Sequence, residues 1–192
     1  PPHTFSGLTF NGTLDELIYL NRSLDATEIS SLYGNSSLGA NYCASYTLVT
    51  GCGTLNSVNE TYILTQNVNS SATCFTIGAN NVTLDCAGYT INYSQSSSGN
   101  GINIQNYNYT TVKNCQVIST SGSGSYAFRL LDSSFNRLTN NTITTIGTGA
   151  HIFYIQTSSY NLISGNRGTG TGTASIGLFI PSANSSNNIF TW

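Results

Sequence analysis

The chain has 192 residues, only 6% of them charged, and a formal net charge of −2. Its five Lys and Arg residues are too few and too scattered to neutralise a nucleic-acid backbone or to hold the chain on an anionic membrane surface. Because 39% of the residues are hydrophobic and recur periodically, the low charge does not indicate disorder. The composition predicts a folded chain with a neutral surface rich in hydroxyl and amide groups.

The sequence contains no Met, so we expect Pro1 to follow a processing or truncation point rather than a translation start. No run reaches the roughly 18 apolar residues of a membrane span. We therefore expect a segment of a longer protein.

Residues 1–40 do not follow the pattern of the remainder. Asn11-Gly12 between apolar runs predicts a hairpin turn. Asp25 and Glu28 match a capping box and predict a short helix, which Gly34 is expected to end.

This segment resembles the C-terminal end of a laminin-G-like, concanavalin A-type jelly roll. The resemblance implies a remnant of that domain at 1–40, with no ligand residue carried over. The matching residues are Phe10, Gly12, Asp15, Glu16, Tyr19, Asn21, Arg22, Leu24, Glu28, Ile29, Leu32 and Tyr33.

Residues 75–190 carry a repeat of about 25 to 27 residues, which predicts a solenoid, and we assign residues 41–192 to it. Apolar-x-apolar triplets mark a first strand, single apolar anchors mark a second, and a third set marks another short strand. Stacked copies would form a parallel β-helix of about five to six coils, all-β in class; a β-sandwich explains the strands but not the fixed period. The triplets are Phe75–Ile77, Ile102–Ile104, Phe128–Leu130, Phe153–Ile155 and Leu178–Ile180; the anchors are Leu84, Val112, Leu138, Ile163 and Ile189; the third set is Ile91, Val117 and Ile143.

The remaining parts of the repeat are assigned to the first coil and to corners. Tyr62–Leu64 is expected to begin the stack, and the Gly- and Ser-rich stretches 94–100, 119–125 and 165–173 to form variable corners. Asn tolerates left-handed backbone, so the repeated Asn residues are expected at bends. These are Asn136, Asn141, Asn161 and Asn166.

Two segments, Cys74–Ile91 and Ser133–Ile143, resemble right-handed parallel β-helices of the pectate-lyase-like superfamily, in the type found in surface proteins. The resemblance covers about three-quarters of the chain and implies a right-handed coil. Enzymes of this superfamily use aspartates that hold calcium beside a base, or paired aspartates that flank a sugar bond.

The carboxylates of this chain do not match those arrangements. Only Asp85 and Asp132 lie on the repeat, and the alignment puts them in different columns. Asp85 aligns with Lys113, which predicts a surface ion pair. A cluster of Arg129, Asp132, Arg137 and Lys113 could form an anion or base site, although ordinary exposed charges would give the same pattern. His151 has no acidic or Cys partner and is expected to be exposed. We predict no catalysis, no metal and no cofactor.

The five cysteines contain no C-x-x-C pair, and two disulfides in an oxidising compartment fit them better than zinc. Cys52–Cys74 and Cys86–Cys115 are the favoured pairs, each between adjacent coils. A local Cys43–Cys52 loop is the alternative. We expect an extracellular or cell-surface location.

Three aromatic residues, Tyr109, Phe135 and Tyr160, align one coil apart, with Tyr107, Tyr126 and Tyr154 nearby. Such a file could stack on sugar rings, or its rings could stack on one another. The chain also carries ten Asn-x-Ser/Thr acceptors, and we expect several to be glycosylated, although the composition alone explains most of them. They are Asn11, Asn21, Asn35, Asn59, Asn69, Asn81, Asn92, Asn108, Asn140 and Asn184.

The sequence therefore predicts a non-catalytic, glycosylated structural protein: a filament, stalk or surface-layer subunit that assembles head to tail with its own copies. Strand donation from residues 5–24 could join the subunits. The alternatives are a glycan-binding adhesin module that contacts extracellular polysaccharide or, less favoured, a polysaccharide lyase or hydrolase. Neither a nucleic-acid partner nor a membrane segment is expected in this chain.

Overall fold

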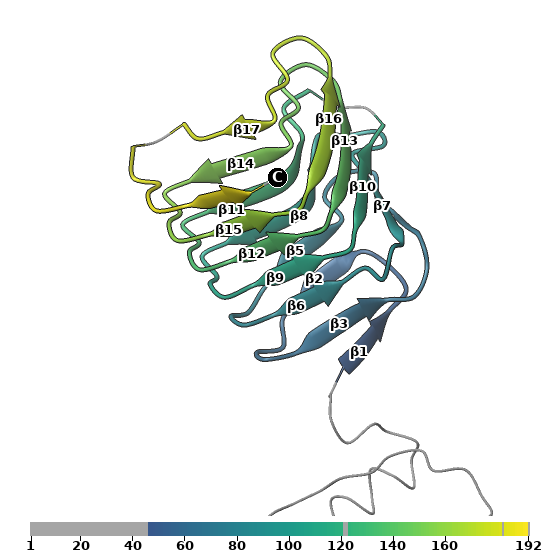
Figure 1. Ribbon diagram of the computed structural model, residues 1–192. Helices are drawn as coiled ribbons and strands as arrows, with labels where there is room; N and C mark the ends of the chain where they lie inside the picture. The colour runs from purple at the N-terminus through teal and green to yellow at the C-terminus, as the bar shows by residue number, and fades with distance from the viewer. Residues whose placement is uncertain (1–45, 121–122, 182, 192) are drawn as a thin grey trace, which may run out of the picture. The chain divides into compact units, whose positions relative to one another are not determined.

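The computed structural model describes residues 46–120, 123–181 and 183–191, and no helix occurs within these ranges. Three parallel sheets of seven, six and five strands are wound from one continuous chain, which visits each sheet in turn (Figure 1). The prediction of an all-β parallel β-solenoid is confirmed. The right-handedness of the coil stays a prediction. The laminin-G-like segment at 1–40 and the strand donor at 5–24 also stay predictions, because these residues lie outside the described ranges, as does Cys43.

The strands are short and take the same place in every turn of the coil. The seven-stranded sheet, called sheet A, comprises β1 (Tyr46–Val49), β3 (Thr61–Leu64), β6 (Thr83–Asp85), β9 (Thr111–Lys113), β12 (Arg137–Thr139), β15 (Leu162–Ser164) and β18 (Ile189–Thr191). Sheet B comprises β2 (Gly53–Leu55), β5 (Phe75–Ile77), β8 (Asn100–Gln105), β11 (Tyr126–Leu131), β14 (Phe153–Gln156) and β17 (Leu178–Phe179). Sheet C comprises β4 (Val68–Asn69), β7 (Thr90–Tyr93), β10 (Gln116–Ser119), β13 (Thr142–Ile146) and β16 (Arg167–Thr171).

The predicted apolar columns form the core. In sheet B each triplet is in register with the next, so that like side chains lie over one another inside the coil. Burial alternates along β5 and β14, as it must when one face of a strand lines the interior, whereas β11 has two buried residues in succession, Ala127 and Phe128. The first column is Phe75, Ile102, Phe128, Phe153 and Leu178, and four residues of the second are Ile77, Ile104, Leu130 and Ile155.

Three expectations about the ends of the stack were wrong. Strand β1 pairs with β3, so the stack begins before Tyr62. Phe190, not Ile189, is in register with Ile163, and Ile189 is exposed. Strand β17 ends at Phe179, so Ile180 follows the strand and is exposed instead of joining the second column.

The stretch 165–173 was expected to be a corner, but β16 occupies most of it and pairs with β13 over five residues. A strand can form here because the ladder uses only backbone groups, which Gly and Thr supply as well as any residue. All five residues are exposed and none is apolar and buried, so the apolar pattern that marks the other strands is missing.

The repeated Asn residues lie at the bends between strands, as expected, but none of the four has the positive φ of a left-handed residue. Asn136 and Asn161 are buried, and Asn161 Oδ1 accepts both the backbone N–H and the side-chain Nδ2–H of Asn136 at 2.8 and 3.0 Å. Asn141 and Asn166 form the same pair at another corner, at 3.0 and 2.9 Å. These inward amide ladders satisfy buried turn N–H groups that the strand ladders cannot reach.

Candidate functional site

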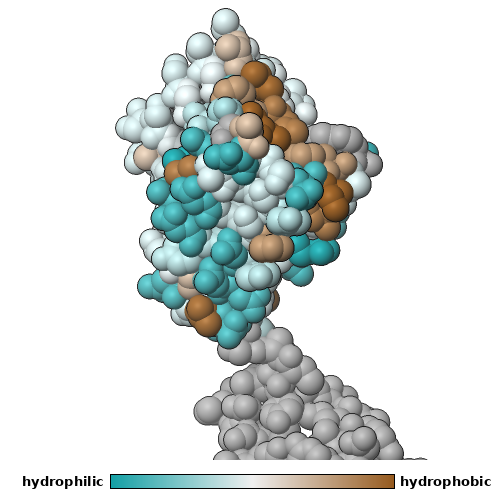
Figure 2. Space-filling model, turned by 90° about the vertical axis from the view of Figure 1, so that its left-hand side faces the viewer, coloured by the Kyte–Doolittle hydropathy of each residue, from teal (hydrophilic) through white to brown (hydrophobic). Residues whose placement is uncertain are grey.

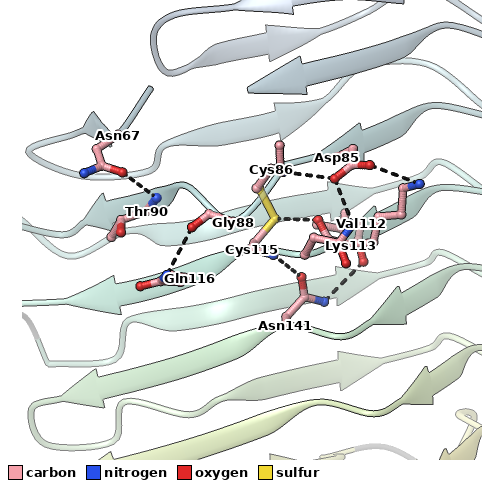
Figure 3. Close-up of a disulfide and its surroundings, with 12 residues drawn as sticks. Asn67, Asp85, Cys86, Gly88, Thr90, Val112, Lys113, Cys115, Gln116 and Asn141 are labelled. Carbon is pink, nitrogen blue, oxygen red and sulfur yellow. Dashed lines mark hydrogen bonds and ion pairs between the residues drawn. A yellow bond between two sulfur atoms is a disulfide. The ribbon is translucent and has the colours of Figure 1, made fainter. Parts of the chain in front are cut away.

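Two disulfides join neighbouring turns, as favoured from the sequence. Cys52 pairs with Cys74 and Cys86 with Cys115, with Cα separations of 4.7 and 4.8 Å. Figure 3 shows the second disulfide between the two turns, where the Cys115 N–H also donates to Asn141 Oδ1 at 3.0 Å. The bridges hold together the part of the stack between β2 and β10, and they indicate an oxidising environment.

The predicted ion pair between Asp85 and Lys113 is present, with Oδ2 3.1 Å from Nζ (Figure 3). Partial burial by itself would raise the pKa of Asp85. Hydrogen bonds from the Ala87 N–H and the Asn114 amide, together with the Lys113 ammonium, outweigh burial and hold the pKa of Asp85 below its ordinary value. These contacts give the carboxylate a structural role at a turn.

The polar groups considered as an anion or base site are not brought together into one constellation. Arg129 Nη1 donates to Asn103 Oδ1 and Gln105 Oε1 at 2.9 and 3.0 Å. Lys113 faces Asp85, and Asp132 is an exposed turn residue with a φ of 49°. Within the described residues, no group of three or more His, Cys, Asp or Glu side chains could hold a metal ion.

His151 was expected to be exposed, and this was wrong. Only 8% of its surface is accessible, and its ring stacks between Tyr126 and Phe179, with centroids 5.5 and 4.6 Å apart. Its Nδ1 accepts the N–H of Ile176 at 3.2 Å, and burial lowers the pKa of His151. His151 precedes the apolar triplet Phe153–Ile155 and belongs to none of the predicted columns, so its burial comes from the aromatic neighbours on adjacent turns.

Around His151 the outer face of sheet B carries a cluster of stacked rings. Tyr126 and Tyr154 lie 4.5 Å apart between centroids, and the Tyr154 hydroxyl donates to Gln156 Oε1 at 2.7 Å. Burial, followed by the nearby Tyr154, raises the pKa of Tyr126. The sequence placed both tyrosines near one another, but it did not place Phe179 with them.

The aromatic file of Tyr109, Phe135 and Tyr160 is formed, and its rings stack on one another. Successive centroids are 5.2 and 5.1 Å apart, with interplanar angles of 12° and 5°. All three residues are exposed and have positive φ, a conformation that costs bulky side chains energy. Neighbouring turns place Asn81 and Asn187, also at positive φ, before and after the file. Successive rings therefore cover each other's facing sides, and Phe135, the middle ring, is the least exposed of the three.

The described acceptors for glycosylation lie along turns and strand ends, and they differ in exposure. Their side chains are in part bonded to one another: Asn81 Nδ2 donates to Asn59 Oδ1 and Asn92 Nδ2 to Asn69 Oδ1, both at 2.9 Å. Exposed are Asn59, Asn69, Asn81, Asn140 and Asn184, and half-buried are Asn92 and Asn108. Asn11, Asn21 and Asn35 lie outside the described residues.

The visible surface agrees with the composition: Figure 2 shows a largely hydrophilic face with hydrophobic residues in separate patches. No protein-family model, curated protein or solved structure matches the chain. The resemblances to pectate-lyase-like and laminin-G-like proteins therefore rest on the motifs themselves. A helix long and apolar enough to cross a membrane is not found in the described ranges.

Proposed function

We propose that this chain is a non-catalytic structural segment of an extracellular, N-glycosylated protein, and that its copies stack end to end into a filament or surface layer. The observation that carries the proposal is the pair of sheet edges at the two ends of the stack, beyond which no further strand lies among the described residues. Strand β1 lies at one end and β16, β17 and β18 lie at the other (Figure 1).

Both ends expose apolar side chains beside an edge strand. Leu48 of β1 is 59% exposed and Tyr46 is 41% exposed, while Ile189 of β18 is 58% exposed. A sheet edge with exposed apolar side chains favours pairing with another strand, because its backbone N–H and C=O groups form a ready ladder.

A second copy of the chain fits these edges better than an unrelated strand. Every strand pair in the stack is parallel, so β18 of one copy could continue into β1 of the next without reversing direction. The contact joins two different surfaces, and a contact of this kind that does not close on itself extends into a fibre. The disulfides and the many acceptor sequons support secretion of such a fibre.

The proposal is tested with the full, oxidised chain at rising concentration by sedimentation and electron microscopy. We expect fibres with a regular subunit repeat, and we expect Leu48→Lys to abolish them because a charge blocks edge pairing. Tyr89→Lys is the matched control: Tyr89 is exposed too, but it lies in a turn along the side of the stack. A monomer at all concentrations, or fibres that survive Leu48→Lys, would count against pairing at this edge.

A glycan-binding module is the second candidate, favoured by the aromatic file. Three bulky residues in a row occupy a left-handed position that Asn fills elsewhere in the same column, although Asn adopts that conformation at lower cost. Self-stacking compensates for part of this cost, which is why binding stands second. Retention of the chain on a polysaccharide column, lost in Tyr109→Asn/Tyr160→Asn, would favour this function over a purely structural one.

A further inference from the structure

Among the acceptor sequons of the described residues, two have a fully buried hydroxyl residue. The hydroxyl residues that complete the sequons of Asn92 and Asn108 are Ser94 and Thr110, and both are fully buried. The corresponding residues of the Asn69, Asn140 and Asn184 sequons are Ser71, Thr142 and Ser186, all of them exposed.

Both buried segments are held by hydrogen bonds to other turns. The Ser94 hydroxyl donates to Ser97 O at 2.8 Å and lies 2.8 Å from Ser125 Oγ. Its backbone N–H donates to Ala72 O at 2.9 Å. The Thr110 N–H donates to the buried amide oxygen of Asn136 at 2.8 Å. Neither hydroxyl can become accessible unless its turn leaves the stack.

Asn69 and Asn92 are neighbours whose sequons can be compared directly. They are register partners on adjacent strands of sheet C, and their side chains share a hydrogen bond of 2.9 Å. Asn92 donates this bond through Nδ2 and is half-buried, whereas Asn69 accepts it through Oδ1 and is exposed. The larger difference between the two sequons is the hydroxyl two residues later, which is exposed at Ser71 and buried at Ser94.

The Cys86–Cys115 disulfide encloses both buried sequons. Its cysteines are 29 residues apart, and Asn92 and Asn108 lie between them, whereas Asn69 and Asn140 lie outside. Once the bond has formed, both ends of this segment are fixed to each other. The disulfide then restricts the conformations that the segment can adopt when it opens, which makes opening less favourable.

Glycosylation at these sites would transfer an oligosaccharide from a lipid diphosphate. Asparagine Nδ2 bonds to C1 of the sugar and loses a proton to a base of the transferase, while the C1–oxygen bond to the diphosphate breaks and the diphosphate leaves with the electron pair. The transferase recognises the hydroxyl of the sequon together with the amide, so it has to reach both.

We infer that Asn92 and Asn108 accept a glycan only before their turns fold and Cys86–Cys115 closes, whereas Asn69 and Asn140 also accept one on the folded chain. The inference rests on the proposed glycoprotein function. It makes occupancy at two sites depend on the order of folding, oxidation and glycan transfer.

The test uses the full chain produced without glycans, as folded oxidised protein and as reduced, denatured protein. Each form is incubated with a purified oligosaccharyltransferase and a lipid-diphosphate oligosaccharide, and occupancy is read site by site from glycopeptide masses. In the folded form we expect Asn92 and Asn108 to be modified about tenfold less than Asn69 and Asn140, because transfer must await local opening. In the denatured form we expect modification at all four sites.

A double variant, Cys86→Ser/Cys115→Ser, should raise occupancy at Asn92 and Asn108 during secretion and leave Asn140 unchanged. Equal modification of all four sites on the folded chain would overturn the inference. So would modification of none on the folded chain and all on the denatured chain, since the backbone rather than the hydroxyl would then limit transfer. Modification of no site in either form, with an active enzyme, would overturn the glycoprotein proposal itself.

Discussion

The early and late turns of the stack hold the same corner, between sheet A and sheet C, by different means. In the early turns Cys86 and Cys115 form a covalent bridge, while in the later turns Asn141 and Asn166 form a buried amide ladder. The two devices meet where the Cys115 N–H donates to Asn141 Oδ1. A disulfide joins only two turns, whereas an amide can accept from one turn and donate to the next.

The corner between sheets B and A also differs between the early and the late turns, although no disulfide joins it. Val82 and Thr110 fill it in the early turns, and Asn136, Asn161 and Asn188 follow in the later ones. Thr110 Oγ1 is buried and has no hydrogen-bond partner, whereas Asn161 bonds to the turns on both sides. The comparison shows that the early half depends on covalent links and the late half on buried polar continuity.

Removing both disulfides should have the largest effect, and it should act on the early half. The bridges close loops with sequence separations of 22 and 29 residues. Loops of this length predict a loss of about 3 kcal/mol in the free energy of unfolding for each bridge. Urea unfolding of the variant with all four bonded cysteines replaced by alanine measures the loss. Hydrogen exchange of the same variant should show greater opening in β2–β10 than in β13–β15. An equal increase in hydrogen exchange in the early and the late strands would contradict the difference between the two halves.

Asn161→Ala should break the late half at a smaller cost. The substitution leaves the Asn136 N–H and amide without their acceptor in a buried site, which predicts a loss of about 3 kcal/mol in the free energy of unfolding. Asn67→Ala is the control, because Asn67 also bridges two turns, through Thr90, but is exposed. It should cost about 1 kcal/mol or less in the same urea titration. Equal losses would show that burial of the ladder is not what matters.

The pH dependence of the last turns should be the smallest effect. Burial lowers the pKa of His151, so the unfolded chain takes up a proton more readily than the folded chain. The free energy of unfolding is thus highest above the unfolded pKa of about 6.5, where His151 is neutral in both states, and it falls as the pH drops below that value. Urea midpoints at pH 7.5 and 5 measure it, with His151→Phe as the control that keeps the ring. Between pH 7.5 and pH 5 the urea midpoint should fall less in His151→Phe than in the unchanged chain. An equal fall would show that other groups cause the pH dependence.

Much of the fold followed from periodicity, because an apolar residue that recurs once per coil has to line the interior of a stack. The register of Ile77, Ile104, Leu130 and Ile155 was predictable for this reason, and so were Cys52–Cys74 and Cys86–Cys115, whose partners lie about one coil apart. The late end was less predictable, since Gly and Thr in β16 pair through backbone groups that leave no apolar signal.

Only the tertiary structure decided which polar residues turn inward. Asn140 and Asn141 are adjacent and chemically identical, yet Asn140 is exposed at a φ of 55° and Asn141 is buried in the ladder. The side chain's direction depends on the turn backbone and on an N–H of the preceding coil, and neither is visible in the local sequence. His151 is buried for the same reason: its stacking partners Tyr126 and Phe179 come from other turns.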